Sequence, residues 1–385
     1  MVKKTDKTLK LKYEIMTNPI QLNQEQERIL SVDFFRGFTM FLLIGESTEL
    51  YSHIQSIQGN SIMQFIGTQL SHHEWNGLHF WDLIQPFFMF IVGVAIPFAV
   101  ANRKKKGDSD KKILLHALKR SALLLFFGWA LYCMEPAKIV FRLQNVLAQL
   151  SVTYLVAFLI MRKSFSFQLI FTLVVLLITD LAYRYFPVDG FNYPWVQYEN
   201  LGAWANNKIE GVDKASIWAS INAFPTIAHT VWGVLFGQLL KSDRTVKNKI
   251  QIMIIAGLAG LLIGYSLDFL HITPIIKKIA TSSFVFASGG WSILALAFCY
   301  WLIDVKKIFT GTKFFIIVGM NCIFIYLLFS VGGAEVIRRF FTPFANSLFS
   351  WGGEITAAII ASLCTWAALW YICYWLYKNK LFIKI

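Results

Sequence analysis

Long apolar runs separated by short polar segments recur along the chain. Ten of these runs reach about 17 to 25 residues, the length that a helix needs to cross the hydrocarbon core of a bilayer. The pattern therefore predicts an all-α, polytopic membrane protein with about ten transmembrane helices. The expected helices lie near residues 34–50, 80–101, 113–133, 145–161, 165–183, 217–240, 250–268, 281–303, 314–331 and 353–377.

Composition supports a membrane protein. Of the 385 residues, 56% are hydrophobic, 16% are aromatic and only 15% are charged, which lies outside the usual profile of a soluble domain. No Gly/Ser-rich linker or low-complexity segment interrupts the apolar runs. We therefore expect one transmembrane domain over residues 31–385, preceded by a basic cytoplasmic segment at 1–30.

Lys and Arg are concentrated in alternate loops. The segments 1–32 and 102–112 contain the most Lys and Arg. The loops expected on the opposite side of the membrane contain fewer. Because Lys and Arg favour the cytoplasmic side, this bias predicts that both termini are cytoplasmic. It also accounts for the net charge of +14 without a nucleic-acid partner.

One outer loop combines several polar groups with the start of an apolar run. It contains the adjacent His72 and His73, followed by Glu74, Trp75 and Asn76, and Asp82 lies just beyond it. Ionisable groups beside a hydrocarbon span usually bind or transform something polar. Histidine serves as a base or a nucleophile near neutral pH, so His72 and His73 are the leading catalytic candidates.

Other polar residues lie at the ends of apolar runs or inside them. Asp33 and Arg36 are spaced to face each other on a helix, and Glu46, Ser47 and Glu49 end the first run on the outer side, where a carboxylate can orient a histidine. Asn321 lies inside a later run. An amide there either joins helices or lines a polar cavity, and both readings stay open.

The outer segment 184–216 mixes aromatic and amide side chains, including Trp195, Trp204 and Asn206. This mixture suits a sugar, whose ring can stack while its hydroxyls need hydrogen bonds, but an interfacial aromatic belt gives the same pattern. The five cysteines show no ligand spacing, so we expect structural thiols and no metal site.

Six segments together resemble the heparan-alpha-glucosaminide N-acetyltransferase family of transmembrane acyltransferases, including its bacterial members. They are SVDFFRG at 31–37, HHEWNGLHFWDLIQPFFMFIVGVAIPF at 72–98, Arg120-Ser121, RLQNVLAQLSVTY at 142–154, TSSFVFASGG at 281–290 and GMNCIFIY at 319–326. Their order along almost the whole predicted membrane domain makes chance similarity improbable.

The resemblance implies that the histidine of an H-x-x-W-N-G-L pattern, here His72, is catalytic. It also implies transfer of an acetyl group from cytosolic acetyl-CoA to a sugar amine or hydroxyl on the other side of a bacterial cytoplasmic membrane, and it suggests a homodimer. We expect the supporting residues to be His73, Glu46, Ser47, Trp75, Asn76, Asp82 and Asn321. The expected contacts with acetyl-CoA are Arg36, Lys119, Arg120 and Ser283.

The chain departs from the family pattern in three places. Glu46-Ser47 stand where the family often has an asparagine, and NVLAQL at 145–150 stands where GVLQRL is common, which removes an arginine. The family's large N-terminal lumenal domain has no counterpart in this sequence. A small sugar or envelope glycan is therefore a better expected acceptor than heparan sulfate.

Two other functions fit the same polar residues. In a transporter or flippase for sugars or lipid-linked sugars, the groups at 46–49, 72–82 and 321 would line a path without chemistry, although no internal repeat supports this. A scaffold that binds acyl-CoA without turnover is the third reading. Direct transfer by His72 and a two-step route through an acetylated histidine also stay open.

Overall fold

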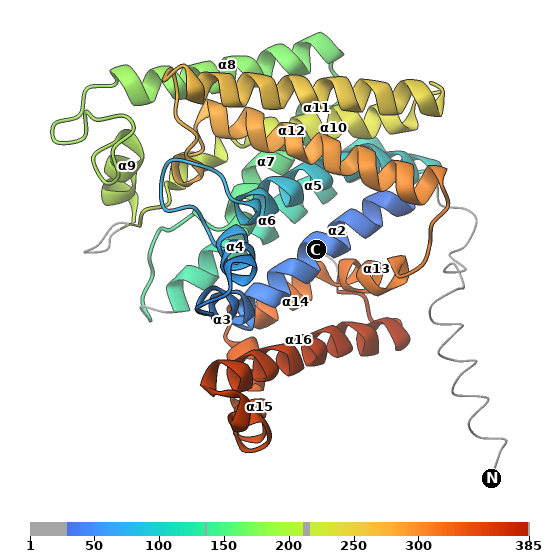
Figure 1. Cartoon of the computed structure of the whole chain (residues 1–385). Coiled ribbons are helices and arrows are strands. Elements are labelled where there is room, and N and C mark those ends of the chain that lie inside the picture. Colours follow the sequence, from blue (N-terminus) through green and yellow to red (C-terminus); the bar gives the residue numbers. More distant parts are fainter. Residues whose placement is uncertain (1–28, 135–136, 211–215, 384–385) are drawn as a thin grey trace. The chain divides into compact units, whose positions relative to one another are not determined.

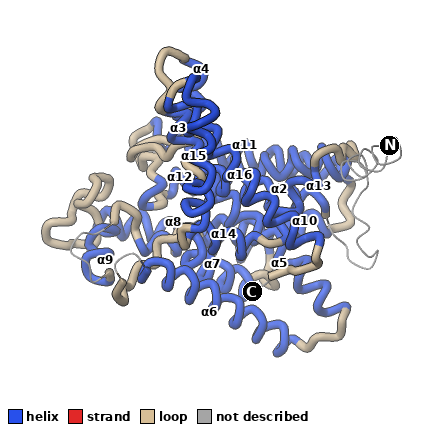
Figure 2. Tube along the Cα trace, turned by 90° about the horizontal axis from the view of Figure 1, so that it is seen from below, coloured by secondary structure: helices blue, strands red, loops and turns tan. Residues whose placement is uncertain are grey.

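The computed structural model describes residues 29–134, 137–210 and 216–383 (Figure 1). Throughout these ranges the regular structure is helical, as Figure 2 shows, and no strand occurs in them. The described residues divide into two compact units. One holds those up to Gly67 together with those from Leu296 onward, and the other holds those from Thr68 to Ala295. Most of the expected segment 1–30 lies outside the described residues.

Unit 1 combines the first helices of the chain with the last ones. It contains α2 (Leu30–Ser47), α3 (Leu50–Gln55), most of α4 (Ser61–Gln69), the π-helix η4 (Tyr300–Val305), α13 (Thr312–Met320), α14 (Cys322–Ser330), α15 (Gly333–Phe349), η5 (Ser350–Gly352) and α16 (Glu354–Lys378).

Unit 2 is built from the middle of the chain. It contains η1 (Phe80–Leu83), α5 (Ile84–Lys105), α6 (Asp110–Met134), α7 (Val146–Ile160), α8 (Phe165–Tyr185), α9 (Leu201–Ile209), η2 (Ser220–Ala223), α10 (Ile227–Lys241), α11 (Val246–Phe269), η3 (Lys277–Ile279) and most of α12 (Ser282–Cys299).

The polytopic, all-helical class is confirmed for the described part of the chain, but a count of ten spans is not. Seven helices there are long and apolar enough to cross a membrane, or up to eight if a bent pair counts as one span. The other two expected runs do form helices. α7 has only 15 residues, and the 18 residues of α2 include Asp33, Arg36 and Glu46, which lower its hydrophobicity.

The bent pair is α13 and α14, which meet at Asn321 with a bend of 72°. The buried side chain of Asn321 donates to the carbonyl of Leu381 at 3.2 Å and accepts from the amide of Ile383 at 3.0 Å. These bonds tie the break to the segment after α16. Of the two roles that the sequence left open for this amide, joining segments is the one that the contacts support.

Helices α5 and α10 of unit 2 pack closely through glycines. A Cβ added at Gly93 would meet the carbonyl of Thr230, and one added at Gly233 would meet the carbonyl of Phe90. Small residues let helix backbones approach closely in a membrane, where dispersion contacts replace the hydrophobic effect between helices. This packing supports the N-terminal end of α5, which carries η1 and Asp82.

We expect Gly93→Ala to destabilise unit 2 by about 1 to 3 kcal/mol, because the added methyl group overpacks a backbone contact that cannot yield. Thermal unfolding of the detergent-solubilised protein measures the loss. Gly260→Ala is the matched control, since its Cβ would lie 3.1 Å from the Cα of Gly290 and needs only a small adjustment. Equal stability of the two variants would contradict the packing argument.

Candidate functional site

The buried carboxylate of Asp82 organises the polar loop before α5. Its side chain is 1% exposed, and Oδ1 lies 2.9 Å from Nδ1 of His72. The other oxygen, Oδ2, accepts hydrogen bonds from the backbone amides of His73 at 3.1 Å and His79 at 3.0 Å. Asp82 therefore fixes both the histidine ring and the backbone on either side of the loop.

Gly77 lets this loop close. Its φ is +145°, and a Cβ there would run into the ring of His73, so a larger residue would meet both a strained backbone and a clash. The amide of Gly77 donates to the carbonyl of Ile275 at 2.8 Å. The glycine of the H-x-x-W-N-G-L pattern thus joins the histidine loop to the segment at residues 272–281, which we call the lysine segment.

The lysine segment brings a cation to the same site. Lys277 in η3 is 6% exposed, and its Nζ lies 3.5 Å from Oδ1 of Asp82 and 3.2 Å from Nδ1 of His72. A buried carboxylate needs such a counter-charge, because an unpaired ion is costly away from water. His72, Asp82 and Lys277 therefore form one charge-balanced group, which we call the triad.

The geometry of the triad sets the proton position on His72. Nδ1 faces both a carboxylate that can accept a proton and an ammonium that cannot. We assign Nδ1–H as the donor to Asp82, because this contact is the shorter of the two and lets Lys277 pair with the same carboxylate. The lone pair of Nε2 is then available as a base or nucleophile.

The surroundings favour the neutral form of His72. Burial lowers its pKa from the ordinary value, the nearby charge of Lys277 lowers it further, and the hydrogen bond with Asp82 opposes both effects. At neutral pH the imidazole is therefore unprotonated, which is the state that a general base requires. The side chain remains 35% exposed, so a reactant can reach it.

Aromatic rings enclose the histidine on the side of η2. The ring of Trp218 meets His72 edge to face at a centroid distance of 5.2 Å, and Trp81 lies 6.5 Å away. Lys277 and Lys278 lie over the Trp218 ring at 5.5 and 5.9 Å. Trp75 points elsewhere, since its indole donates to the carbonyl of Trp195 at 2.7 Å.

The lysine segment is held rigidly from both ends. Arg184 and Asp180 of α8 bond to the hydroxyl of Thr273 at 2.9 and 3.1 Å, and the carbonyl of Lys278 accepts from Ala219 and Asn222. Closer to the span, the buried Ser283 donates to the carbonyl of Pro274 at 2.7 Å. These contacts explain how a charged side chain is placed beside His72 with little freedom.

The structure places the predicted residues of unit 2 in different roles. His72, His73 and Asp82 share one group, while Asn76 is an exposed neighbour in the same loop. On α6, Arg120 lies over the ring of Tyr154 at 4.7 Å, and Lys119 is exposed.

The predicted residues of unit 1 have their own partners. Arg36 pairs with Asp33 at 2.7 Å, as the spacing suggested. The hydroxyl of Ser47 donates to the carbonyl of Ile44, and Glu46 is exposed. Asn321 bonds to the C-terminal segment as described above.

Reasoning from the sequence missed Lys277 and Trp218. Both lie far from His72 along the chain, Trp218 at the start of the expected run 217–240 and Lys277 just before the run 281–303, so no local pattern brings them together. One signal was present for the lysine, since Lys277 and Lys278 are adjacent cations in a loop that the expected topology places on the side poor in basic residues. A lysine on the side expected to be poor in basic residues suggests a nearby carboxylate that pairs with it, and here that carboxylate is Asp82.

Comparisons with known proteins agree with the resemblance seen in the motifs. Residues 28–186 match the family model described as "Domain of unknown function (DUF5009)". The chain is also 26% identical to the heparan-alpha-glucosaminide N-acetyltransferases of Mus musculus and Homo sapiens, over 93% of its own length and 60% of theirs. It therefore spans about three fifths of these curated relatives, and the aligned part includes the loop that holds His72.

We expect Lys277→Gln to raise the pKa of His72, because the substitution removes a positive charge that disfavours the imidazolium. The pH dependence of His72 modification by diethyl pyrocarbonate, followed by peptide mass spectrometry, measures this pKa. The wild-type midpoint should lie below the ordinary histidine value, and the variant's midpoint should move to higher pH.

Lys278→Gln is the matched control for this measurement. Its charge has the weakest influence on His72 among the groups that act on that pKa, so the expected shift is smaller. An unchanged or lower midpoint in Lys277→Gln would show that Lys277 does not act on His72 through its charge.

Proposed function

We propose that this protein is a transmembrane acetyltransferase that moves an acetyl group from acetyl-CoA to an amine or hydroxyl of a sugar on the opposite side of a bacterial cytoplasmic membrane. The observation that carries the proposal is the ring of His72 held by the buried Asp82, beside Lys277, within the H-x-x-W-N-G-L pattern. Similarity to two named N-acetyltransferases across 93% of the chain supports this type of reaction.

In the proposed reaction, Nε2 of His72 removes a proton from the acceptor as its nitrogen or oxygen attacks the thioester carbonyl. The carbon–sulfur bond then breaks, and the departing thiolate takes the proton from the imidazolium. Asp82 holds the ring in the required tautomer and stabilises the imidazolium while it exists. Lys277 forms an ion pair with Asp82, and its charge lowers the pKa of His72, so the imidazole is less often protonated before the acceptor reacts.

A two-step route uses the same nitrogen. Nε2 attacks the thioester directly, the thiolate leaves, and the acetyl-imidazole then transfers its acetyl group to the acceptor. The proton of the acceptor passes to solvent or to the thiolate. The triad serves both routes equally well, because each needs an unprotonated Nε2.

The donor's phosphates need cations. In unit 2 we propose Lys119 and Arg120 for such contacts, and in unit 1, taken by itself, Arg36, because guanidinium and ammonium groups suit phosphate oxygens. Ser283 was expected beside the donor as well. Its hydroxyl already donates to Pro274, so we propose that it supports the donor site by fixing the lysine segment.

A transporter or flippase is the second candidate function, and the break at Asn321 favours it. Discontinuous helices inside the membrane are a common feature of transport sites, and α13 and α14 form such a pair. Against this, the side-chain oxygen and nitrogen of Asn321 are already hydrogen-bonded to the C-terminal segment.

We expect His72→Gln to reduce acceptor-dependent release of free CoA by about 10²- to 10⁴-fold, the usual contribution of a general base. The assay uses purified protein, acetyl-CoA and a panel of amino sugars. His116→Gln is the matched control, because His116 is an exposed histidine of α6 and should retain full activity. Acceptor movement across vesicles without CoA release would instead identify a transporter.

The two chemical routes differ in what accumulates without acceptor. We expect direct transfer, so incubation with acetyl-labelled acetyl-CoA alone should leave His72 unlabelled while acceptor addition starts CoA release. Mass spectrometry of the peptide containing His72 makes the measurement. A stoichiometric acetyl group on that peptide, absent from His72→Gln, would establish the two-step route.

A further inference from the structure

Helix α15 differs from the helices around it in its charge pattern. It connects α14 to α16 and has 17 residues, among them Glu335, Arg338 and Arg339. It is not one of the helices of the described chain that are apolar enough to span a membrane. Figure 1 shows it against the N-terminal part of α16, which is such a helix.

The side chains of α15 divide into three faces. One face packs on unit 1 and contains the buried Ala334 and Ala345. The second is polar and exposed, with Glu335, Arg339 and Asn346. The third is mainly apolar and equally exposed. Its apolar residues, 56 to 69% exposed, recur at every fourth position: Val336, Phe340, Phe344 and Leu348. The exposed Ser347 lies among them.

Three faces of this kind match three different surroundings. At about 100° per residue, Glu335, Arg339 and Asn346 gather within roughly 40° of the helix circumference, and the apolar residues occupy a sector of roughly 120° beside them. In water, the apolar sector of α15 would be exposed at a cost in free energy, and in hydrocarbon its charged residues would lose their hydration. At a membrane surface the apolar sector contacts acyl chains while the charged residues stay in water.

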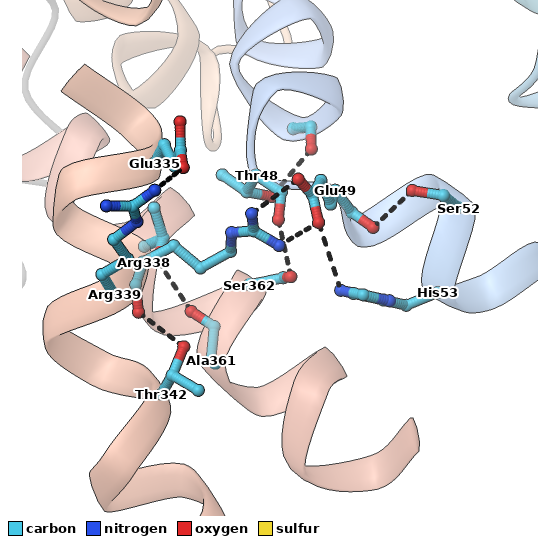
Figure 3. A network of polar contacts seen from close by, with 12 residues as sticks. Thr48, Glu49, Ser52, His53, Glu335, Arg338, Arg339, Thr342, Ala361 and Ser362 are labelled. Carbon is cyan, nitrogen blue, oxygen red and sulfur yellow. Dashed lines mark hydrogen bonds and ion pairs between the residues drawn. The ribbon is translucent and has the colours of Figure 1, made fainter. Parts of the chain in front are cut away.

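Contacts within unit 1 fix where α15 sits (Figure 3). Arg338 donates to both carboxylate oxygens of Glu49, the residue that follows the C-terminal end of α2, with one bond of 2.6 Å. Next to it, Ser362 of α16 donates to the carbonyl of Thr48 at 2.7 Å. α15 is therefore anchored to the segment that follows α2, beside α16, which is long and apolar enough to cross a membrane.

We propose that α15 is an interfacial helix whose apolar face binds phospholipid at the boundary between acyl chains and headgroups, on the side of the membrane where α16 begins. Amphipathic helices with charged polar faces adopt this position. The apolar face continues into Trp351 of η5, which is 84% exposed, and tryptophan is enriched at this depth. The proposal does not depend on the proposed function.

The charges of α15 further define the lipid that it binds. Arg338 is paired with Glu49, and Arg339 is paired with Glu335, so its polar face is nearly neutral. Basic amphipathic helices draw much of their membrane affinity from anionic lipids. α15 should instead be held by its apolar area, and zwitterionic phospholipid should suffice.

Nitroxide labels at two introduced cysteines test the position of the helix. The intact chain carrying Phe340→Cys or Asn346→Cys is reconstituted in phosphatidylcholine vesicles, and the signal of the unsubstituted protein is subtracted. A label at 340 should collide several-fold more often with oxygen than with a water-soluble nickel chelate, and a label at 346 should show the reverse. Replacing part of the lipid with phosphatidylglycerol should leave the ratio at 340 unchanged.

Three results would overturn the proposal. Nickel access at 340 would place the apolar face in water, and shielding of 340 from both reagents would place it against a second copy of the chain. A ratio at 340 that rises with phosphatidylglycerol would contradict attachment by apolar area.

A second measurement leaves α15 unaltered. Vesicles of acyl-brominated phosphatidylcholine should quench the wild-type fluorescence more than that of Trp351→Phe, because the exposed indole of Trp351 lies at the proposed depth. Equal fractional quenching of the two proteins would also count against the lipid contact.

Discussion

The candidate site depends on the negative charge that Asp82 carries where little water can reach it. Leaving such a charge unpaired would cost several kcal/mol, so the surrounding chain must supply donors and a counter-ion. Two backbone amides, the ring of His72 and the ammonium of Lys277 meet this requirement together. The loop conformation, the histidine tautomer and the position of the lysine segment thus have one electrostatic origin.

Much of this site was predictable because its main members are close in sequence. His72, Gly77 and Asp82 lie within one short loop, and their residue types indicated a polar site beside a span. Lys277 was not predictable in the same way, since about two hundred residues separate it from Asp82 and only the fold of unit 2 brings them together. Lys277 and Lys278 are adjacent in a loop that the expected topology places on the side poor in Lys and Arg. The number of basic residues per loop could not show which carboxylate pairs with them.

The helical fold was predictable from the apolar runs, but the number of spans was not. A run of apolar residues predicts a helix whether or not that helix is long enough to cross the bilayer, and α7 illustrates the difference. The break between α13 and α14 depends on bonds from Asn321 to residues near the chain's end, which no local pattern contains. Contacts between distant segments therefore decided what the hydrophobic pattern left open.

Where GVLQRL is common in the family that the chain resembles, NVLAQL stands here, and the structure shows a physical consequence. Gln149, at the position of the lost arginine, is 1% exposed and accepts from the amide of Gln85 at 2.7 Å. A neutral amide needs only hydrogen bonds in such a place, whereas an arginine would need a carboxylate beside it.

The carboxylate that Gln149 reaches through hydrogen-bonded neighbours is Glu210, and it already pairs with Arg142. Gln149 also donates to the carbonyl of Gln144, and the side chain of Gln144 donates to the buried Glu210, which pairs with Arg142 at 3.3 Å. Burial raises the pKa of Glu210, and the backbone hydrogen bond from Ser216 and the charge of Arg142 oppose that shift. The glutamine at 149 thus places no charge on this face of α7, and its side chain is hydrogen-bonded through both its oxygen and its nitrogen.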